Sequence, residues 1–167
     1  PPMVSNGLTI FISQSGETAD TLAALRHCKS LGQKTISIVN VGDSSMCRVS
    51  DASLKIYAGP EIGVASTKAF TCQLGVLACL AIKMGTLNGS LTKEQEKEYV
   101  KSLLSIPRLI SNTLDKEDEI IDLAHDLSNI TTTLYLGRGQ MYPVAMEGAL
   151  KLKEISYVHA EGYPAGE

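Results

Sequence analysis

The sequence predicts an α/β fold in which a parallel sheet lies between helices. Three short segments, residues 8–13, 34–40 and 52–58, are rich in apolar β-forming residues, as the strands of parallel sheets are. Helical periodicity over residues 18–31 separates the first two segments, and a polar stretch over residues 41–51 separates the second from the third. Strands connected in this way are typical of a parallel sheet with crossover connections.

The first helix and the polar stretch have recognisable local signals. Leu22 and Leu25 belong to an apolar series at helical spacing, and Gly32 follows it as a typical helix end. In the polar stretch after the second strand, Ser44 and Ser45 are able to cap a short helical turn.

Residues 68–84 are apolar on nearly every side and follow a loop, residues 59–67, that contains glycine and proline. Ser66 or Thr67 is well placed to cap this helix. Its length of about 17 residues is at the lower limit for a membrane span, and three polar residues interrupt it. Helices that are apolar all round are usually buried, so we expect a core helix and no membrane segment.

A helical connector is expected next. Thr92 and Gln95 form a capping box at the start of a charged amphipathic helix over residues 92–112. Pro107 should kink or divide this helix. A further helix is expected over residues 115–127, because acidic residues at its start suit the helix dipole.

The strand and helix pattern then starts again. A strand is expected over residues 132–137, a helix over residues 142–158, and a loop in the remainder. This order echoes the first half of the chain and suggests an internal repeat. We therefore expect three parts: a first α/β domain over residues 1–90, a helical connector over residues 91–123, and the start of a second α/β domain over residues 124–167.

The composition is that of an ordinary globular protein, with 44% hydrophobic and 20% charged residues and a net charge of −3. A mildly acidic chain lacks the basic surface of a nucleic-acid binder. The four cysteines have neither metal-site nor disulfide-framework spacing, and we expect Cys72 and Cys79 to be small buried hydrophobic residues. The start, Pro-Pro-Met-Val, is neither an initiator methionine nor a signal peptide, so we expect a piece of a longer protein.

Hydroxyl-bearing residues follow the first strand. Ser13, Gln14, Ser15 and Thr18 lie where a parallel strand ends and a helix begins, which is where open α/β sheets bind ligands. Backbone N–H groups and the positive end of the helix favour an anion there, and the absence of a lysine distinguishes the turn from a P-loop. The turn suits a phosphate group, or these residues simply cap the helix. The Ser66-Thr67 helix start is a second candidate for oxygens of the same ligand.

Glu147, Lys151 and Glu154 form a charged stripe on the expected helix over residues 142–158. At about 100° per residue, the three side chains fall within about 60° of one another, and apolar residues lie on both flanks. One interpretation is the wall of a polar pocket in which a carboxylate takes and returns protons. The alternative is a set of exposed i,i+4 ion pairs. Lys153 points to the opposite side and is expected to be solvated, and His159 follows closely enough to touch such a pocket.

Four motifs together resemble a known family. They are Ser-Gln-Ser-Gly-Glu-Thr-Ala-Asp-Thr from Ser13, Glu-Ile-Gly-Val-Ala-Ser-Thr-Lys-Ala-Phe-Thr from Glu61, Leu-Gly-Arg-Gly from Leu136, and Glu-Gly-Ala-Leu-Lys-Leu-Lys-Glu-Ile-Ser-Tyr from Glu147. Over nearly its whole length the sequence is similar to the isomerase half of the glutamine–fructose-6-phosphate aminotransferases. The first motif marks only the wider sugar isomerase (SIS) fold, whereas the second and fourth together are more specific.

The resemblance implies a fold, an activity and a setting. It implies SIS-type parallel sheets flanked by helices. The chain would contain a first SIS domain that lacks its start, followed by the beginning of a second SIS domain. The family activity is amination and isomerisation of fructose 6-phosphate to glucosamine 6-phosphate, with glutamine as nitrogen donor. It implies a cytoplasmic homodimer without a metal ion or organic cofactor, and no nucleic-acid partner.

The resemblance also assigns roles by motif. The residues that would hold the phosphate of the sugar are Ser13, Gln14, Ser15 and Thr18. Val64 and Ser66 would contact the sugar body. Glu154 would be the base that moves a proton between C1 and C2 of the fructose imine, and Lys151 would assist at the neighbouring oxygen while helping to keep Glu154 ionised.

Several parts of the family pattern are missing from this sequence. They are the glutaminase domain, an early sugar-binding serine, a later Lys-His-Gly-Pro motif and the lysine that forms a Schiff base. We therefore expect part of a site and no turnover by the fragment alone. Two alternatives remain: a related SIS deaminase or isomerase, which could share the serine turn and the helix glutamate, and a sugar-phosphate-sensing SIS module, which would need only the turn.

Overall fold

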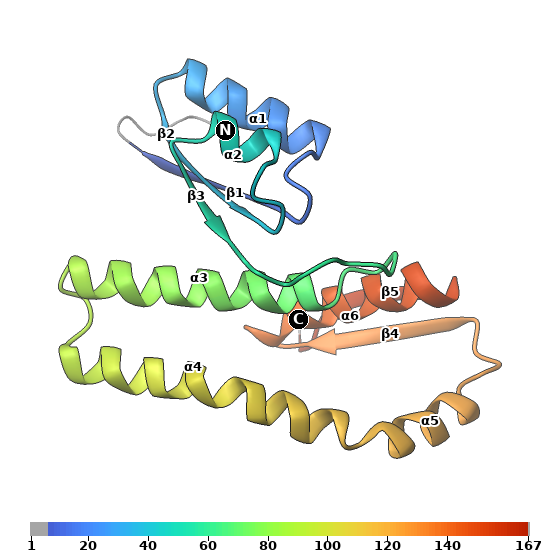
Figure 1. Cartoon of the computed structure of the whole chain (residues 1–167). Helices are drawn as coiled ribbons and strands as arrows, with labels where there is room; N and C mark the ends of the chain where they lie inside the picture. Colours follow the sequence, from blue (N-terminus) through green and yellow to red (C-terminus); the bar gives the residue numbers. More distant parts are fainter. Residues whose placement is uncertain (1–6, 167) are drawn as a thin grey trace. The chain divides into compact units, whose positions relative to one another are not determined.

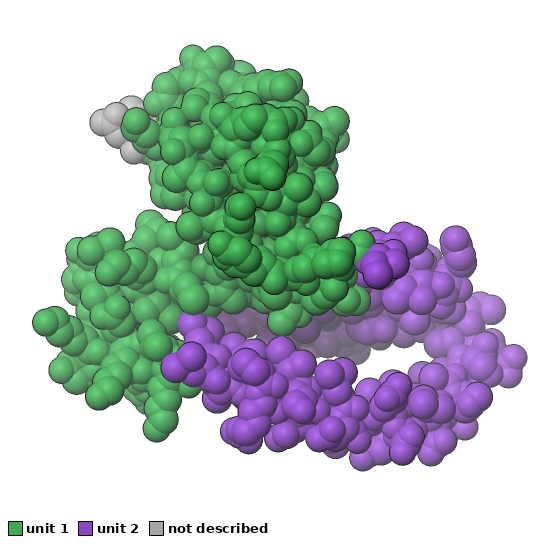
Figure 2. Space-filling model, viewed as in Figure 1, with its two compact units in different colours: residues 1–61, 67–101 green, residues 62–66, 102–167 purple. Residues whose placement is uncertain are grey.

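The computed structural model describes residues 7–166, which form two compact units (Figure 2). Unit 1 comprises residues 7–61 and Thr67–Lys101, and unit 2 comprises Ile62–Ser66 and residues 102–166. Each unit contains a parallel strand–helix–strand arrangement, as the echo in the sequence suggests. The expected domain boundaries near residues 90 and 123 stay predictions.

Unit 1 contains a parallel three-stranded sheet in the order β1-β2-β3 (Figure 1). β1 (Leu8–Ser13) pairs in register with β2 (Lys34–Val39), and β2 pairs with β3 (Ala52–Lys55). The first strand confirms the prediction, and the third is shorter than predicted. Tyr57 has a φ of 52°, and this left-handed conformation takes the backbone out of the extended region after β3.

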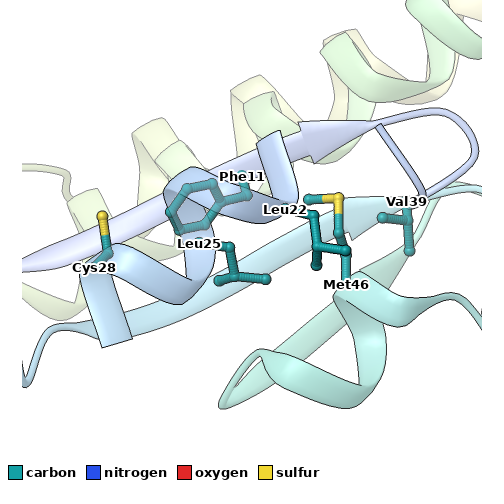
Figure 3. Close-up of a cluster of buried hydrophobic side chains, with 6 residues drawn as sticks. All are labelled: Phe11, Leu22, Leu25, Cys28, Val39 and Met46. Atoms are coloured by element: carbon teal, nitrogen blue, oxygen red, sulfur yellow. The ribbon is translucent and has the colours of Figure 1, made fainter. Parts of the chain in front are cut away.

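Two helices complete the core on one side of this sheet. α1 (Ala19–Ser30) crosses from β1 to β2, and α2 (Ser45–Val49) is the short helical turn predicted between β2 and β3. Side chains from both helices and from β1 and β2 meet in one buried cluster (Figure 3), whose members are Phe11, Leu22, Leu25, Cys28, Val39 and Met46. Burial of these side chains anchors α1 and α2 to the sheet.

The apolar helix α3 (Lys68–Leu87) is three residues longer than predicted, and the expectation that it is buried is wrong within the described residues. Only Ala69 is buried in it. Ala69 packs with Ile38 and Ile56 against the sheet, but Cys79 is exposed. One face of α3 meets the sheet, and the described residues cover its other faces only in part. By length and a mean hydropathy of 1.5, α3 also meets the criterion for a membrane span, as some soluble core helices do.

The capping box at the start of α4 (Lys93–Leu114) is confirmed. Gln95 N–H donates to Thr92 Oγ1 at 3.2 Å, and Thr92 N–H donates to Gln95 Oε1 at 2.9 Å. Pro107 lies inside α4 and does not divide it. α5 (Glu117–Asp126) follows with three acidic residues in its first turn, as predicted.

Unit 2 contains β4 (Thr132–Gly137), α6 (Met141–Ser156) and β5 (His159–Pro164). β5 pairs in parallel with β4 over six residue pairs, so the predicted loop after residue 158 is wrong. Because glycine and proline are uncommon in strands, the sequence of β5 does not predict a strand. Its small residues allow α6 to lie close against it. A Cβ on Gly162 would lie 2.9 Å from Met146 Cα, and Ala160 is fully buried.

Candidate functional site

In unit 1, the serine turn (residues 13–18) connects β1 to α1 at the carboxyl end of the sheet. Ser13 is the last residue of β1 and is buried, whereas Thr18 is the exposed N-cap of α1. Their hydroxyl oxygens lie 2.9 Å apart, and Ser13 Oγ also accepts the N–H of Gly16 at 3.0 Å. Thr18 makes no side-chain capping hydrogen bond, so the capping alternative is wrong for Thr18, whereas the Ser13 hydroxyl does bond to the backbone of the turn.

The other two predicted phosphate ligands lie in the same turn. Ser15 is half-buried, and its Oγ accepts the N–H of Glu17 at 3.1 Å. Gln14 is half-buried and lines a cavity of about 570 Å³. The other residues that line this cavity come from the segments that follow β2 and β3, namely Asn40, Val41, Tyr57, Gly59, Pro60 and Glu61. The structure therefore brings Ser13, Gln14, Ser15 and Thr18 together at the helix end, where anions bind favourably.

The turn depends on a glycine that sequence reasoning did not single out. Gly16 has a φ of +68°, and a Cβ there would overlap Ser44 Oγ. Its carbonyl accepts the N–H of Met46 at 3.1 Å. The Ser-Gly pair inside a polar turn was the available signal, because glycine is the residue that adopts positive φ without strain.

The segment Ile62–Ser66, which contains the two predicted sugar contacts, belongs to unit 2. Val64 is 94% exposed and Ser66 is half-buried. Among the described residues, the Ser66 hydroxyl has no hydrogen-bond partner. Both side chains are therefore accessible to a ligand.

The start of α3 is capped by a residue that the sequence analysis missed. Thr67 occupies the predicted N-cap position, but its side chain makes no capping hydrogen bond. Instead, the Glu61 carboxylate accepts Thr67 N–H at 3.3 Å and Ala69 N–H at 3.1 Å. Glu61 lies too far along the chain for the usual capping patterns to reveal it.

In unit 2, the predicted charged stripe on α6 is confirmed as a set of contacts. Lys151 Nζ lies 2.7 Å from Glu154 Oε2 and 3.5 Å from Glu147 Oε1. The side chains are 22–32% exposed. The hydrogen bond to Glu154 raises the pKa of Lys151, against the opposing effect of partial burial. The lysine therefore stays protonated between two carboxylates.

The burial of this stripe is intermediate between that of a pocket wall and that of exposed ion pairs, the two interpretations of the sequence. Exposures of 22–32% are lower than those of freely solvated ion pairs, yet the flanking Leu150 and Ile155 are themselves 41% and 66% exposed. The stripe is thus an accessible ionic surface with apolar borders. A carboxylate in such a place is able to exchange protons with a bound molecule.

The remaining charged groups near α6 contact Glu161 on β5. Its Oε1 lies 3.8 Å from Lys153 Nζ and 4.0 Å from His159 Nε2. Lys153 is exposed, as predicted for a solvated charge, and forms an exposed ion pair with Glu161. His159 is exposed, and its predicted contact with a pocket stays a prediction. Within residues 7–166, no three His, Cys, Asp or Glu side chains are placed to hold a metal ion.

Comparison with known sequences identifies close relatives of the whole chain. The SIS domain profile matches residues 1–83 and 126–167. The chain is 55% identical over 167 residues to the glutamine–fructose-6-phosphate aminotransferase [isomerizing] of Bartonella quintana, and 57% identical over 166 residues to that of Brucella abortus. These alignments cover 100% and 99% of the chain. The chain spans only 28% and 27% of the length of these relatives.

Solved structures give the same relationship. The C-terminal domain of glucosamine-fructose-6-phosphate aminotransferase from Francisella tularensis matches 99% of the chain with a TM-score of 0.96 and 48% identity, and the match covers 48% of that domain. Glucosamine-6-phosphate deaminase from Thermotoga maritima matches 98% of the chain with a TM-score of 0.77 and 25% identity, over 47% of its own length. Both comparisons agree with the expected SIS-type α/β fold.

Proposed function

The chain belongs to the SIS domain family, and from this premise we propose that it is the sugar-phosphate isomerase portion of a glutamine–fructose-6-phosphate aminotransferase. The whole protein would convert fructose 6-phosphate and glutamine to glucosamine 6-phosphate and glutamate for hexosamine biosynthesis. The identity of 55–57% to curated aminotransferases along the entire chain supports this proposal.

One structural observation carries the proposal: Glu154 accepts a 2.7 Å hydrogen bond from Lys151 on an accessible face of α6. A module that only senses sugar phosphates would need the serine turn and would have no use for a carboxylate paired with a lysine. An isomerase needs such a carboxylate, because the reaction moves a proton between adjacent carbon atoms.

The serine turn would hold the phosphate of the sugar. The hydroxyls of Ser13, Ser15 and Thr18 and the amide of Gln14 would donate hydrogen bonds, and the N-terminus of α1 would favour the negative charge. In the free turn these hydroxyls bond to one another and to the backbone, so the phosphate would replace weak internal partners. Val64 and Ser66 would contact the sugar body and fix its orientation.

Glu154 would carry out the proton transfer. Its carboxylate would take the proton from C1 of the sugar imine, and the electron pair of that bond would form a C1–C2 double bond while neutralising the protonated imine nitrogen. Return of the proton to C2, with loss of the proton from the O1 hydroxyl, gives an aldehyde at C1 and an amine at C2. Lys151 would assist at O1, 2.7 Å from the carboxylate that it orients.

We also propose that the full-length protein is a cytoplasmic homodimer. The exposed apolar faces of α3, on which Leu74 and Met84 are nearly half exposed, support an association with a second copy. We expect no nucleic-acid partner, since the net charge is −3, and no membrane insertion of α3. Light scattering of the full-length protein after gel filtration tests the dimer directly.

The second candidate is a glucosamine-6-phosphate deaminase or related isomerase, which the structural match to the Thermotoga maritima deaminase favours. Such an enzyme would use the same turn and the same base without glutamine. The two candidates differ in one assay: glutamine-dependent formation of glucosamine 6-phosphate distinguishes the aminotransferase from a deaminase that releases ammonia.

The proposal is tested with the full-length protein and its Glu154→Gln variant. Glu154→Gln should abolish isomerisation, while the Kd for glucosamine 6-phosphate measured by isothermal titration stays within about tenfold, because the base acts mainly in the transition state. Glu161→Gln, on β5 of the same unit, is the matched control and should leave both values unchanged. Loss of binding with unchanged turnover would contradict the role of Glu154.

A further inference from the structure

The serine turn is attached to the segment after β2 by three hydrogen bonds that backbone N–H groups donate. Asn40 N–H donates to the Gln14 carbonyl at 3.0 Å, and Met46 N–H donates to the Gly16 carbonyl at 3.1 Å. The third comes from the first residue of α2, whose N–H donates to a side chain: Ser45 N–H to Glu17 Oε1 at 2.7 Å. It is the shortest of the three and the only one that a substitution in the turn can remove.

The contact between the turn and α2 leaves no free space. Gly16 adopts a φ of +68°, and a Cβ at this position would overlap both Oγ and Cβ of Ser44. Ser44 is the N-cap of α2 and is 1% exposed. A displacement of α2 would therefore move the backbone of the turn with it.

Glu17 is a carboxylate beside residues that we propose to bind a phosphate. Its negative charge would repel a ligand that it faced, but the carboxylate is held by the N–H of Ser45 at the start of α2. The hydrogen bond from the Ser45 N–H lowers the pKa of Glu17, and the nearby Arg48 guanidinium adds to the effect, so the carboxylate stays ionised. Arg48 in turn donates to Ser45 Oγ at 3.1 Å. The carboxylate of Glu17 and the guanidinium of Arg48 therefore both contact the first residue of α2.

We propose that Glu17 is a positioning residue for the phosphate-binding turn. By capping α2 through Ser45 N–H, its carboxylate holds the backbone between Ser15 and Thr18 in the conformation that presents both hydroxyls to the ligand. This inference rests on the proposed function of the turn as a sugar-phosphate site, and it adds a residue that need not touch the sugar.

The test uses two substitutions that break the same hydrogen bond from opposite sides, in the full-length protein. Glu17→Ala removes the acceptor. Ser45→Pro removes the donor, and proline is tolerated here because Ser45 is the first residue of α2 and Ser44 has the extended backbone that precedes proline well. Ser45→Ala is the matched control, because it removes only the hydroxyl and keeps the N–H.

Isothermal titration with glucosamine 6-phosphate and steady-state kinetics give the readouts. Glu17→Ala and Ser45→Pro should each raise Kd and KM by about tenfold, the order expected when binding groups are misplaced, with kcat within about threefold. The double variant should be no weaker than either single variant, since both remove one interaction. Glu17→Gln keeps an oxygen acceptor and should restore most of the affinity, whereas Ser45→Ala should stay within about twofold of wild type.

The controls separate this inference from the function on which it rests. If wild type binds and Ser15→Ala weakens binding, but either Glu17→Ala or Ser45→Pro leaves Kd unchanged, the positioning role is overturned alone. Tighter binding by both Glu17→Ala and Glu17→Gln would also overturn it, because the carboxylate would then act only by repulsion. If wild type does not bind, both proposals fail. Circular dichroism checks folding, and Glu17→Gln and Ser45→Pro carry the test if Glu17→Ala does not fold.

Discussion

Lys151 and Glu154 lie on one face of α6 and share a hydrogen bond of 2.7 Å between Nζ and Oε2. Glu147 contacts the same ammonium from the preceding turn, at 3.5 Å. A lysine between two carboxylates is common on exposed helices and contributes little to their stability. Here the group is less than one third exposed, and its orientation is fixed by contacts within one helix. It is suited to chemistry that needs a carboxylate in one fixed position.

Replacement of Lys151 should slow catalysis more than it weakens binding. Lys151→Gln removes the ammonium that orients Glu154 and that would act at O1 of the sugar, so we expect kcat to fall by about 100-fold with Kd within about tenfold. Lys153→Gln, on the same helix, is the control and should keep kcat within about twofold. A kcat unchanged in Lys151→Gln would show that the pair is only a surface ion pair.

Replacement of Ser15 should weaken substrate binding more than it slows catalysis. Ser15→Ala removes one proposed phosphate donor from a turn whose backbone is otherwise fixed, so KM for fructose 6-phosphate should rise by about tenfold with little change in kcat. Ser30→Ala is the matched control, because the Ser30 hydroxyl only donates to the His27 carbonyl at the end of α1. An unchanged KM in Ser15→Ala would exclude this hydroxyl from the binding site.

Acid should weaken unit 1 through Asp51. Hydrogen bonds from Lys29 and then from Thr35 lower the pKa of Asp51 to about 2, whereas an unfolded aspartate titrates near about 3.9. A depressed pKa stabilises the folded state above the unfolded value, and this contribution disappears as the pH falls from about 4 to about 2. Urea midpoints measured across this range should fall less steeply in Asp51→Asn than in wild type.

Lys29 offers an independent check on the same carboxylate. Lys29 Nζ lies 3.0 Å from Asp51 Oδ1, and Lys29→Met removes the largest cause of the pKa shift. The acid-dependent loss of stability should then be smaller and should end at a higher pH than in wild type. Identical pH profiles for wild type and Asp51→Asn would contradict this assignment.

Tyr57 should be replaceable with a gain in stability. It has a φ of 52° and is 85% exposed, so its side chain offers little packing to offset a conformation that costs an L-residue about 1 kcal/mol. Tyr57→Asn, a residue that adopts this region more readily, should stabilise the protein by about 0.5 kcal/mol. Tyr57→Val, which is β-branched, should destabilise it, and thermal melting of both variants gives the comparison.

The features that sequence reasoning predicted correctly are those with local causes. The boundaries of β1 follow from a short apolar run, and the Thr92–Gln95 capping box follows from two residues three positions apart. The stripe of Glu147, Lys151 and Glu154 follows from helix periodicity alone. The proposed roles of these residues came from the family resemblance and not from their spacing.

The features that it missed depend on contacts between distant segments. β5 carries no strand pattern, and its pairing with β4 is made possible by Gly162 and Ala160 beneath α6. The Glu61 cap on α3 and the Glu17 contact with Ser45 each join segments that only the folded backbone brings together. The exposure of α3 could not be predicted, because composition does not say which faces a neighbour covers.

The most direct test is a crystal structure of the full-length protein with glucosamine 6-phosphate bound. We expect the phosphate within hydrogen-bond distance of the Ser13, Ser15 and Thr18 hydroxyls, and C1 or C2 of the same molecule about 3–3.5 Å from the Glu154 carboxylate, as proton transfer requires. A sugar phosphate held by the serine turn with Glu154 facing away from it would contradict the proposed catalytic role.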